Sequence, residues 1–79
     1  MMDLSKKEVR ENLNKIMNEV MYADYQSRDI TPFQIAKKKL VSSRLDTTYE
    51  YIQILVEMGN LRIVERDNRK FLEIVLKED

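Results

Sequence analysis

Apolar residues in the first third of the chain recur at the spacing of an amphipathic helix. They follow one another at intervals of four, three and four positions: Val9, Leu13, Ile16 and Val20. Upstream of them, Ser5 and Glu8 have the spacing of a capping box, in which each side chain accepts a hydrogen bond from the backbone N–H of the other residue. This pattern predicts a helix over about residues 5–25, followed by a polar loop over residues 26–29.

A second helix start lies at Thr31 and Pro32. A threonine side chain can cap the free N–H groups of a helix, and a proline at the first helical position loses no hydrogen bond there. The apolar residues that follow share one side of the expected helix: Phe33, Ala36 and Leu40. We therefore predict a helix over about residues 32–41 and then a turn over residues 41–44, after which Leu45 returns to the core.

A third helix is predicted over about residues 47–58. Asp46 or Thr47 is expected to cap it, because Thr47 and Glu50 again have the spacing of a capping box. Its apolar side is expected to face the core and carries Thr48, Tyr51, Ile52, Leu55 and Met58. Gly59, the only glycine of the chain, stands just past the end, where a left-handed residue commonly terminates a helix.

After this glycine the hydrophobic pattern changes to a period of two, which is the period of a β-strand. Side chains of alternating character run over residues 61–66 and again over 71–76, and both runs contain the β-branched residues that strands favour. Asp67 and Asn68 lie between the runs and tolerate the left-handed backbone of a tight turn. The sequence therefore predicts a β-hairpin over about residues 61–76, and a fold that is mostly α-helical with a C-terminal β-hairpin.

Length and composition narrow the class of protein. A chain of 79 residues suffices for one domain with a thin core, since a body of this size buries only roughly 60% of the surface that its unfolded chain exposes. Fourteen basic and fourteen acidic residues give no net charge, which argues against a nonspecific coat on nucleic acid. The N-terminus offers no apolar stretch for a signal peptide or a bilayer span, so we expect a cytoplasmic protein with no membrane partner.

Catalysis is not expected of this chain. It has no histidine and no cysteine, and it has neither a glycine-rich phosphate loop nor a pair of carboxylates spaced for acid and base roles. The same absences leave no disulfide, no redox group and no obvious cluster of metal ligands. We therefore expect no cofactor and no bound metal, and the pattern shows no pocket for a small-molecule ligand.

The order of the elements resembles that of a winged helix-turn-helix domain. Residues 35–40, IAKKKL, resemble its second helix, in which a small alanine lets two helices cross closely. Residues 47–61 resemble its recognition helix and the glycine that leads into the wing. The resemblance covers nearly the whole chain and is closest to small archaeal, viral and bacterial transcription regulators. The stretch from Ala36 to Gly59 is slightly longer than usual, which indicates an extended second helix or an extended turn.

The resemblance implies that the third helix enters the major groove of double-stranded DNA, while the second helix and the wing contact the backbone. Gln53 would then pair with adenine, and Glu50 would accept a hydrogen bond from cytosine. Thr47 and Tyr49 would contact phosphate or sugar, and Arg44 a phosphate or a guanine. The remaining cations implied at the DNA are Lys37, Lys38, Arg66, Arg69 and Lys70. Sequence-specific DNA binding by a transcriptional regulator is the leading interpretation.

Each part of this interpretation has a simpler alternative. Asp46 and Glu57 lie on the outward side of the third helix, where they would repel phosphates, although Asp46 can also serve as a cap that the helix dipole stabilises. The lysine run at residues 37–39 is equally typical of a solvated helix face, and the cations of the hairpin are typical of a protected sheet edge. A winged-helix module that binds another protein, without reading DNA, is therefore the alternative function.

The predicted first helix is long for so small a body. Met17 and Met21 widen its apolar stripe and are most simply part of the core. Tyr22 and Tyr25 add large amphipathic surface of the kind that is enriched at protein interfaces. We therefore expect a homodimer formed through these four residues. A two-fold dimer would present two recognition helices to a palindromic site.

Overall fold

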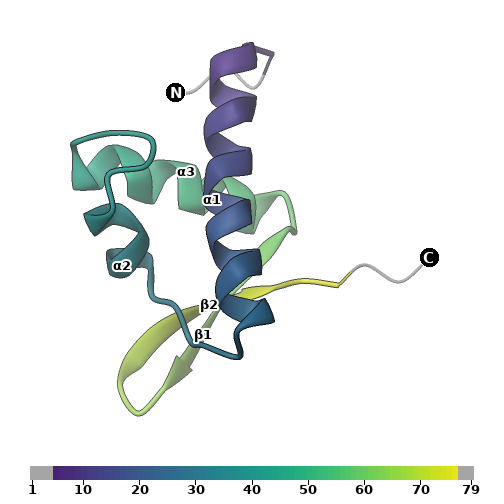
Figure 1. Ribbon diagram of the computed structural model, residues 1–79, viewed down its shortest axis with the longest axis vertical. Helices are drawn as coiled ribbons and strands as arrows, with labels where there is room; N and C mark the ends of the chain where they lie inside the picture. The colour runs from purple at the N-terminus through teal and green to yellow at the C-terminus, as the bar shows by residue number, and fades with distance from the viewer. Residues whose placement is uncertain (1–4, 77–79) are drawn as a thin grey trace.

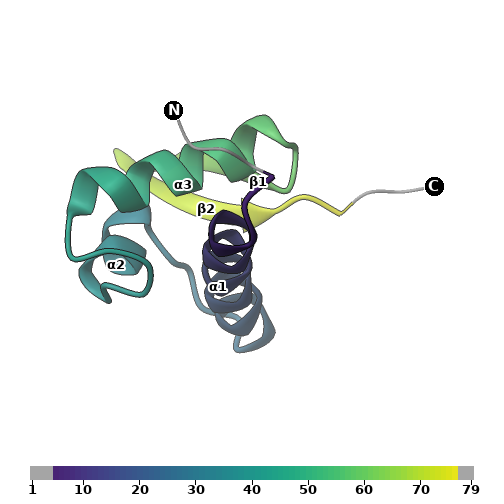
Figure 2. The same cartoon turned by 90° about the horizontal axis from the view of Figure 1, so that it is seen from above.

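The computed structural model describes residues 5–76 and has three helices and one β-hairpin within that range. The elements follow the order α1 (Lys7–Tyr25), α2 (Pro32–Lys37), α3 (Leu45–Glu57), β1 (Leu61–Arg66) and β2 (Arg69–Ile74). Figure 1 shows α1 crossing α3, with α2 beside the N-terminal end of α3 and the hairpin near the C-terminal end of α1. In Figure 2, which looks nearly along α1, α3 and the hairpin lie on the same side of that helix. The prediction of a mostly helical chain with a C-terminal hairpin is confirmed.

The start of α1 differs from the capping box that the sequence predicted. The N-cap residue is Lys6 rather than Ser5, and the Lys6 side chain makes no cap hydrogen bond. The Lys6 backbone is extended, and its carbonyl accepts the first helical hydrogen bond from the Arg10 N–H at 3.2 Å. The predicted end is confirmed: α1 stops at Tyr25, and Ser27 takes a left-handed conformation with φ of 55°.

The start of α2 confirms its predicted cap. The Thr31 hydroxyl accepts a hydrogen bond from the Gln34 N–H at 3.1 Å, and the Gln34 side chain accepts one from the Thr31 N–H at 3.0 Å. The predicted end near residue 41 is wrong, because α2 ends at Lys37 and Lys39 adopts a left-handed conformation with φ of 55°. That conformation interrupts helical hydrogen bonding. Of the two alternatives for the long central stretch, an extended turn over residues 38–44 is the one found.

The start of α3 also differs from the prediction. The helix begins at Leu45, and its N-cap is Arg44 rather than Asp46 or Thr47. The reason is that the Arg44 carbonyl already accepts the Thr48 N–H at 3.4 Å, ahead of the predicted cap. Leu45 consequently lies on the outer side of the first turn and is 41% exposed, so its predicted return to the core is wrong.

The buried side of α3 otherwise follows the prediction. Four of its expected residues are buried: Thr48, Tyr51, Ile52 and Leu55. The fifth, Met58, is the C-cap residue and is exposed, because the chain leaves the helix there. Gly59 has φ of 80°, and the N–H of Asn60 reaches back to the Leu55 carbonyl at 3.0 Å. The predicted role of this glycine as a left-handed helix terminator is therefore confirmed.

The hairpin closes through the predicted Asp67-Asn68 turn. Both residues have positive φ, 52° and 62°, which defines the two-residue turn that matches the twist of paired strands. The register places Ile63 opposite Leu72. On the other edge of β2, the Leu72 N–H donates to the Ile30 carbonyl at 2.8 Å, in an isolated β-bridge. This bridge attaches the hairpin to the segment between α1 and α2.

The core lies where α1, α3 and the hairpin meet. The predicted apolar stripe of α1 is buried: Val9, Leu13, Ile16 and Val20. One polar contact joins the two long helices inside this core, because the Asn12 side-chain amide donates to the Tyr51 hydroxyl at 3.0 Å. Both residues are buried, so the hydrogen bond satisfies groups that water cannot reach.

The short helix α2 faces the core with Ile35 and Ala36, which are both buried. Phe33, which we expected on the buried side, is 54% exposed. On a helix, Phe33 lies about 200° around the axis from Ile35, so burying one of them turns the other outward. Ile35 is buried, and the large ring of Phe33 therefore lies on the surface.

Candidate nucleic-acid interface

A hollow of about 870 Å³ opens between α2, the start of α3 and the tip of the hairpin. Four of the residues predicted to contact DNA line it: Lys37, Tyr49, Arg69 and Lys70. Lys37 is the last residue of α2, and Tyr49 lies in the second turn of α3. Arg69 and Lys70 begin β2, directly after the hairpin turn. The fold thus brings together three segments that are far apart in the sequence. We call this feature the basic hollow.

The charges around the basic hollow are unbalanced in favour of cations. Lys37, Arg69 and Lys70 are exposed, and none of the three forms an ion pair with another residue of the range 5–76. The one carboxylate among the lining residues, Asp29, lies 2.8 Å from the Arg66 guanidinium. Three cations without an ion-pair partner therefore line one hollow, which favours the binding of an anion such as a phosphate.

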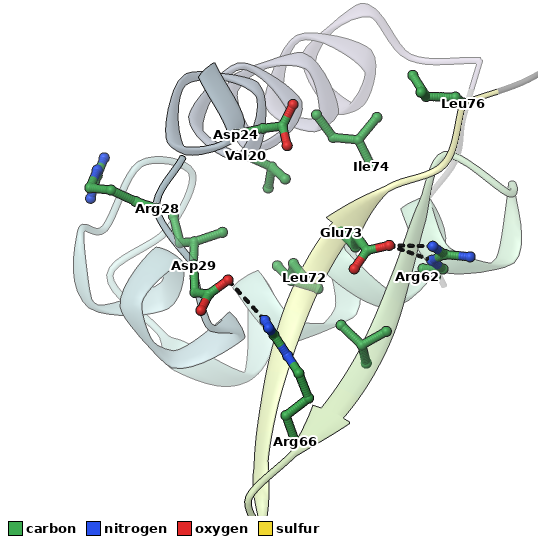
Figure 3. A pocket seen from close by; sticks show the side chains of 12 residues that line it. Val20, Asp24, Arg28, Asp29, Arg62, Arg66, Leu72, Glu73, Ile74 and Leu76 are labelled. Carbon is green, nitrogen blue, oxygen red and sulfur yellow. Dashed lines mark hydrogen bonds and ion pairs between the residues drawn. The ribbon is translucent and has the colours of Figure 1, made fainter. Parts of the chain in front are cut away.

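Arg66 was predicted to contact DNA, and the structure gives it other partners. Its guanidinium donates to Asp29 at 2.8 Å and lies over the Phe71 ring, 4.8 Å from the centroid. Figure 3 shows this ion pair and a neighbouring one between Arg62 and Glu73, at a second hollow of about 440 Å³ between α1 and the hairpin. Exposed ion pairs contribute at most about 1 kcal/mol. The pair with Asp29 nevertheless holds the hairpin close to the segment that precedes α2.

Arg44 and Asp46 form a two-point ion pair at the start of α3. The Arg44 Nε donates to Asp46 Oδ1 at 3.2 Å, and the Arg44 Nη2 donates to Oδ2 at 2.9 Å. These hydrogen bonds, helped by one from the Thr47 N–H, lower the pKa of the Asp46 carboxyl. Asp46 is therefore negatively charged but lies against a guanidinium. The Arg44 guanidinium therefore weakens the predicted repulsion between Asp46 and a DNA phosphate.

Lys38 lies on a different side of α2 from the hairpin cations. Its Nζ is 2.8 Å from the Glu19 carboxylate, which ties the end of α2 to α1. A smaller hollow, of about 370 Å³, opens on this side and is lined by both Lys37 and Lys38. Lys37 therefore borders two hollows, whereas Lys38 belongs to the smaller one and is already paired.

The outward side of α3 carries the remaining predicted contacts. Glu50 and Gln53 are exposed, and their side chains form no hydrogen bond with residues of the part of the chain that the structure describes. Tyr49 precedes Gln53 by four positions, so the two lie on one side of the helix. The Thr47 side chain is half-buried. A row of available polar groups therefore runs along α3 from the basic hollow.

The chain matches no protein-family model, no curated protein and no solved structure. Among residues 5–76, no group of three carboxylates is arranged to hold a metal ion. No helix within the same range is both long and apolar enough to cross a bilayer. The surface itself therefore provides the evidence on function.

Two aromatic residues of the basic hollow, Phe33 and Phe71, were not predicted as site residues. Phe33 was expected in the core, and Phe71 was counted only as a strand residue. A signal for Phe33 was present, because Ile35 and Ala36 are adjacent apolar residues that can form the buried side of so short a helix without it. No signal marked Phe71, since its place at the hollow depends on how the hairpin meets α2.

A strip of exposed apolar and aromatic side chains runs along the C-terminal half of α1. Met21 and Tyr22 are about half exposed, and Tyr25 is 88% exposed. Met17 is partly buried and packs against the core. Of the four residues expected at a dimer interface, three are therefore available to a partner, and Met17 already contributes to the fold.

Proposed function

We propose that this chain is a winged helix-turn-helix protein that binds double-stranded DNA sequence-specifically, as a small transcriptional regulator. The fold supports the proposal because α2 packs against α3 and the hairpin follows α3 directly. The isolated Ile30–Leu72 bridge attaches the segment that precedes α2 to the edge of the hairpin. The observation that carries the function is the basic hollow, where three unpaired cations from α2 and the hairpin flank the exposed start of α3.

In this proposal α3 enters the major groove and the basic hollow receives the adjoining phosphate backbone. Lys37 and the two hairpin cations, Arg69 and Lys70, would neutralise phosphates and fix the position of the protein on the duplex. Gln53 would read adenine through its amide, and Glu50 would accept a hydrogen bond from cytosine N4. The position of α3 on DNA is thus set by the cations, and the base preference by its outward side chains.

The three paired cations enter the proposal in a different way. Arg44, Lys38 and Arg66 each have a carboxylate partner at the surface. An exposed ion pair is worth about 0–1 kcal/mol, so a phosphate can replace the carboxylate at little cost. Their contribution to binding is nevertheless smaller than that of the unpaired cations, because each exchange leaves a carboxylate without its partner.

We further propose that the protein is a homodimer formed through the exposed strip of α1. Tyr25 is 88% exposed, and Met21 and Tyr22, both about half exposed, extend the same surface. A two-fold dimer would bind half-sites whose centres lie about 34–36 Å apart, which is one turn of the double helix. A palindromic operator is the expected target.

The alternative function is a module that binds another protein. The pairing of half of the predicted cations with carboxylates favours it, as does the zero net charge. Selection from a pool of random duplexes, followed by fluorescence anisotropy at increasing salt, separates the two functions. DNA binding through several phosphates must weaken steeply with salt. Absence of binding to every duplex at low salt would leave the protein-binding module as the function.

A further inference from the structure

We infer that the basic hollow holds an unpaired base, so that the protein prefers DNA in which a duplex adjoins a single-stranded segment. The inference rests on the proposed DNA binding and specifies its ligand. Its basis is that two exposed aromatic rings, Phe33 and Tyr49, line the same hollow as the unpaired cations Lys37, Arg69 and Lys70. Aromatic rings within a cationic groove are the combination by which proteins bind single-stranded nucleic acid.

The fold does not require the exposed ring of Phe33. The buried side of α2 consists of Ile35 and Ala36, whereas Phe33 is 54% exposed at the start of the helix. An exposed apolar ring gains free energy only when a partner covers it. At this position the partner must also tolerate three positive charges, and an apolar core segment of another protein would not. A nucleotide satisfies both conditions, since it carries a flat aromatic base and a phosphate.

A continuous duplex leaves these rings without a base to stack on. Its phosphates satisfy the cations, but its bases are stacked on one another inside the helix and present no face to Phe33 or Tyr49. An unpaired base is free to leave the stack and lie on an aromatic ring. The rings therefore distinguish a nucleotide in a single strand from one in a duplex.

The other lining groups of the basic hollow already have partners. The side chain of Thr31 and that of Gln34 form the cap of α2. Asp29 is held by Arg66, whose guanidinium also covers the ring of Phe71. The groups left to a ligand are therefore the cations and the two exposed rings, which match the phosphate and the base of one nucleotide.

Three DNA ligands of one sequence test the inference: a blunt duplex, the same duplex with a short single-stranded overhang, and the overhang strand alone. Fluorescence anisotropy with the full chain gives each affinity. We expect the overhang to tighten binding by about 5- to 150-fold over the blunt duplex, the range that base stacking on an aromatic ring provides. A 2-aminopurine in the overhang should lose fluorescence on binding, because stacking quenches it.

Phe33→Ala should abolish the gain from the overhang and leave the affinity for the blunt duplex unchanged, while Phe33→Tyr keeps the ring and should keep the gain. Met58→Ala, which removes another exposed apolar side chain outside the basic hollow, is the matched control. Equal affinity for blunt and overhang duplexes overturns the inference but not the proposed function. So does a Phe33→Ala protein that still gains from the overhang. No binding to any of the DNAs overturns both.

Discussion

Replacing Lys37, Arg69 and Lys70 together by alanine removes the three unpaired charges of the basic hollow. Each phosphate contact contributes about 0.9 to the slope of log K against log salt concentration. If each cation contacts one phosphate, the triple variant should lose about 2.7 from that slope. Over a fourfold rise in salt, from about 50 to 200 mM, the wild type should then lose about 40-fold more affinity than the variant. Fluorescence anisotropy of a selected duplex at four salt concentrations measures both slopes.

A second triple variant, Lys6→Ala with Arg10→Ala and Lys15→Ala, is the matched control. It removes the same net charge from exposed positions at or near α1, outside the basic hollow. Its slope should equal that of the wild type, and circular dichroism should show that both variants fold. If the two triple variants reduced the salt-dependence slope equally, net charge rather than the basic hollow would attract the DNA. An unchanged slope in the first triple would refute the assignment of phosphates to these cations.

Three further predictions concern stability and assembly. Tyr51→Phe leaves the buried Asn12 amide without its acceptor and should lower the free energy of unfolding by about 1–3 kcal/mol in urea titrations. Gly59→Ala should lower the free energy of unfolding by about 1–2 kcal/mol. The cause is the left-handed backbone alone, since an added Cβ meets nothing within 4 Å. An unchanged urea midpoint would contradict the role of Gly59 as a left-handed terminator. Tyr22→Glu with Tyr25→Glu should convert the proposed dimer to a monomer by light scattering, whereas a wild-type monomer would exclude the dimer.

The elements that the sequence located well are those with a local chemical signal. Thr31 is recognisable as a cap because its partner Gln34 is three positions away, and the bond forms within one turn. Asp67 and Asn68 tolerate positive φ, and both adopt it. Gly59 ends α3 for the same conformational reason. In each case the structure depends on residues that are neighbours in the chain, so the pattern is sufficient.

The boundaries that were missed depend on contacts that no local pattern contains. Lys39 takes a left-handed conformation although lysine has no preference for it. No residue type in the sequence therefore signals the end of α2. Arg44 caps α3 with its backbone alone, whereas the stronger cap residues Asp46 and Thr47 lie inside the helix. The helices on either side of this turn, α2 and α3, pack against each other, and the residue types of the turn do not encode such contacts.

The candidate site was predictable in its residue types but not in its pairings. The partners Lys38 and Glu19 are separated by 19 positions, and Arg66 and Asp29 by 37. Only the fold shows that Lys38 and Arg66 are paired with carboxylates, whereas Lys37 is not. The exposure of Phe33 is likewise a consequence of which side of α2 is buried.

Zero net charge is therefore a poor guide to the electrostatics of this protein. Each of three carboxylates, on Glu19, Asp29 and Asp46, holds one cation at a distance of at most 2.9 Å. A pair of opposite charges this close has a field that falls off quickly, so a phosphate several ångströms away interacts mainly with cations that have no partner. Lys37 and the two hairpin cations line the same hollow, and their fields add there. A neutral chain can thus present a cationic surface, and the arrangement of its ion pairs determines where that surface lies.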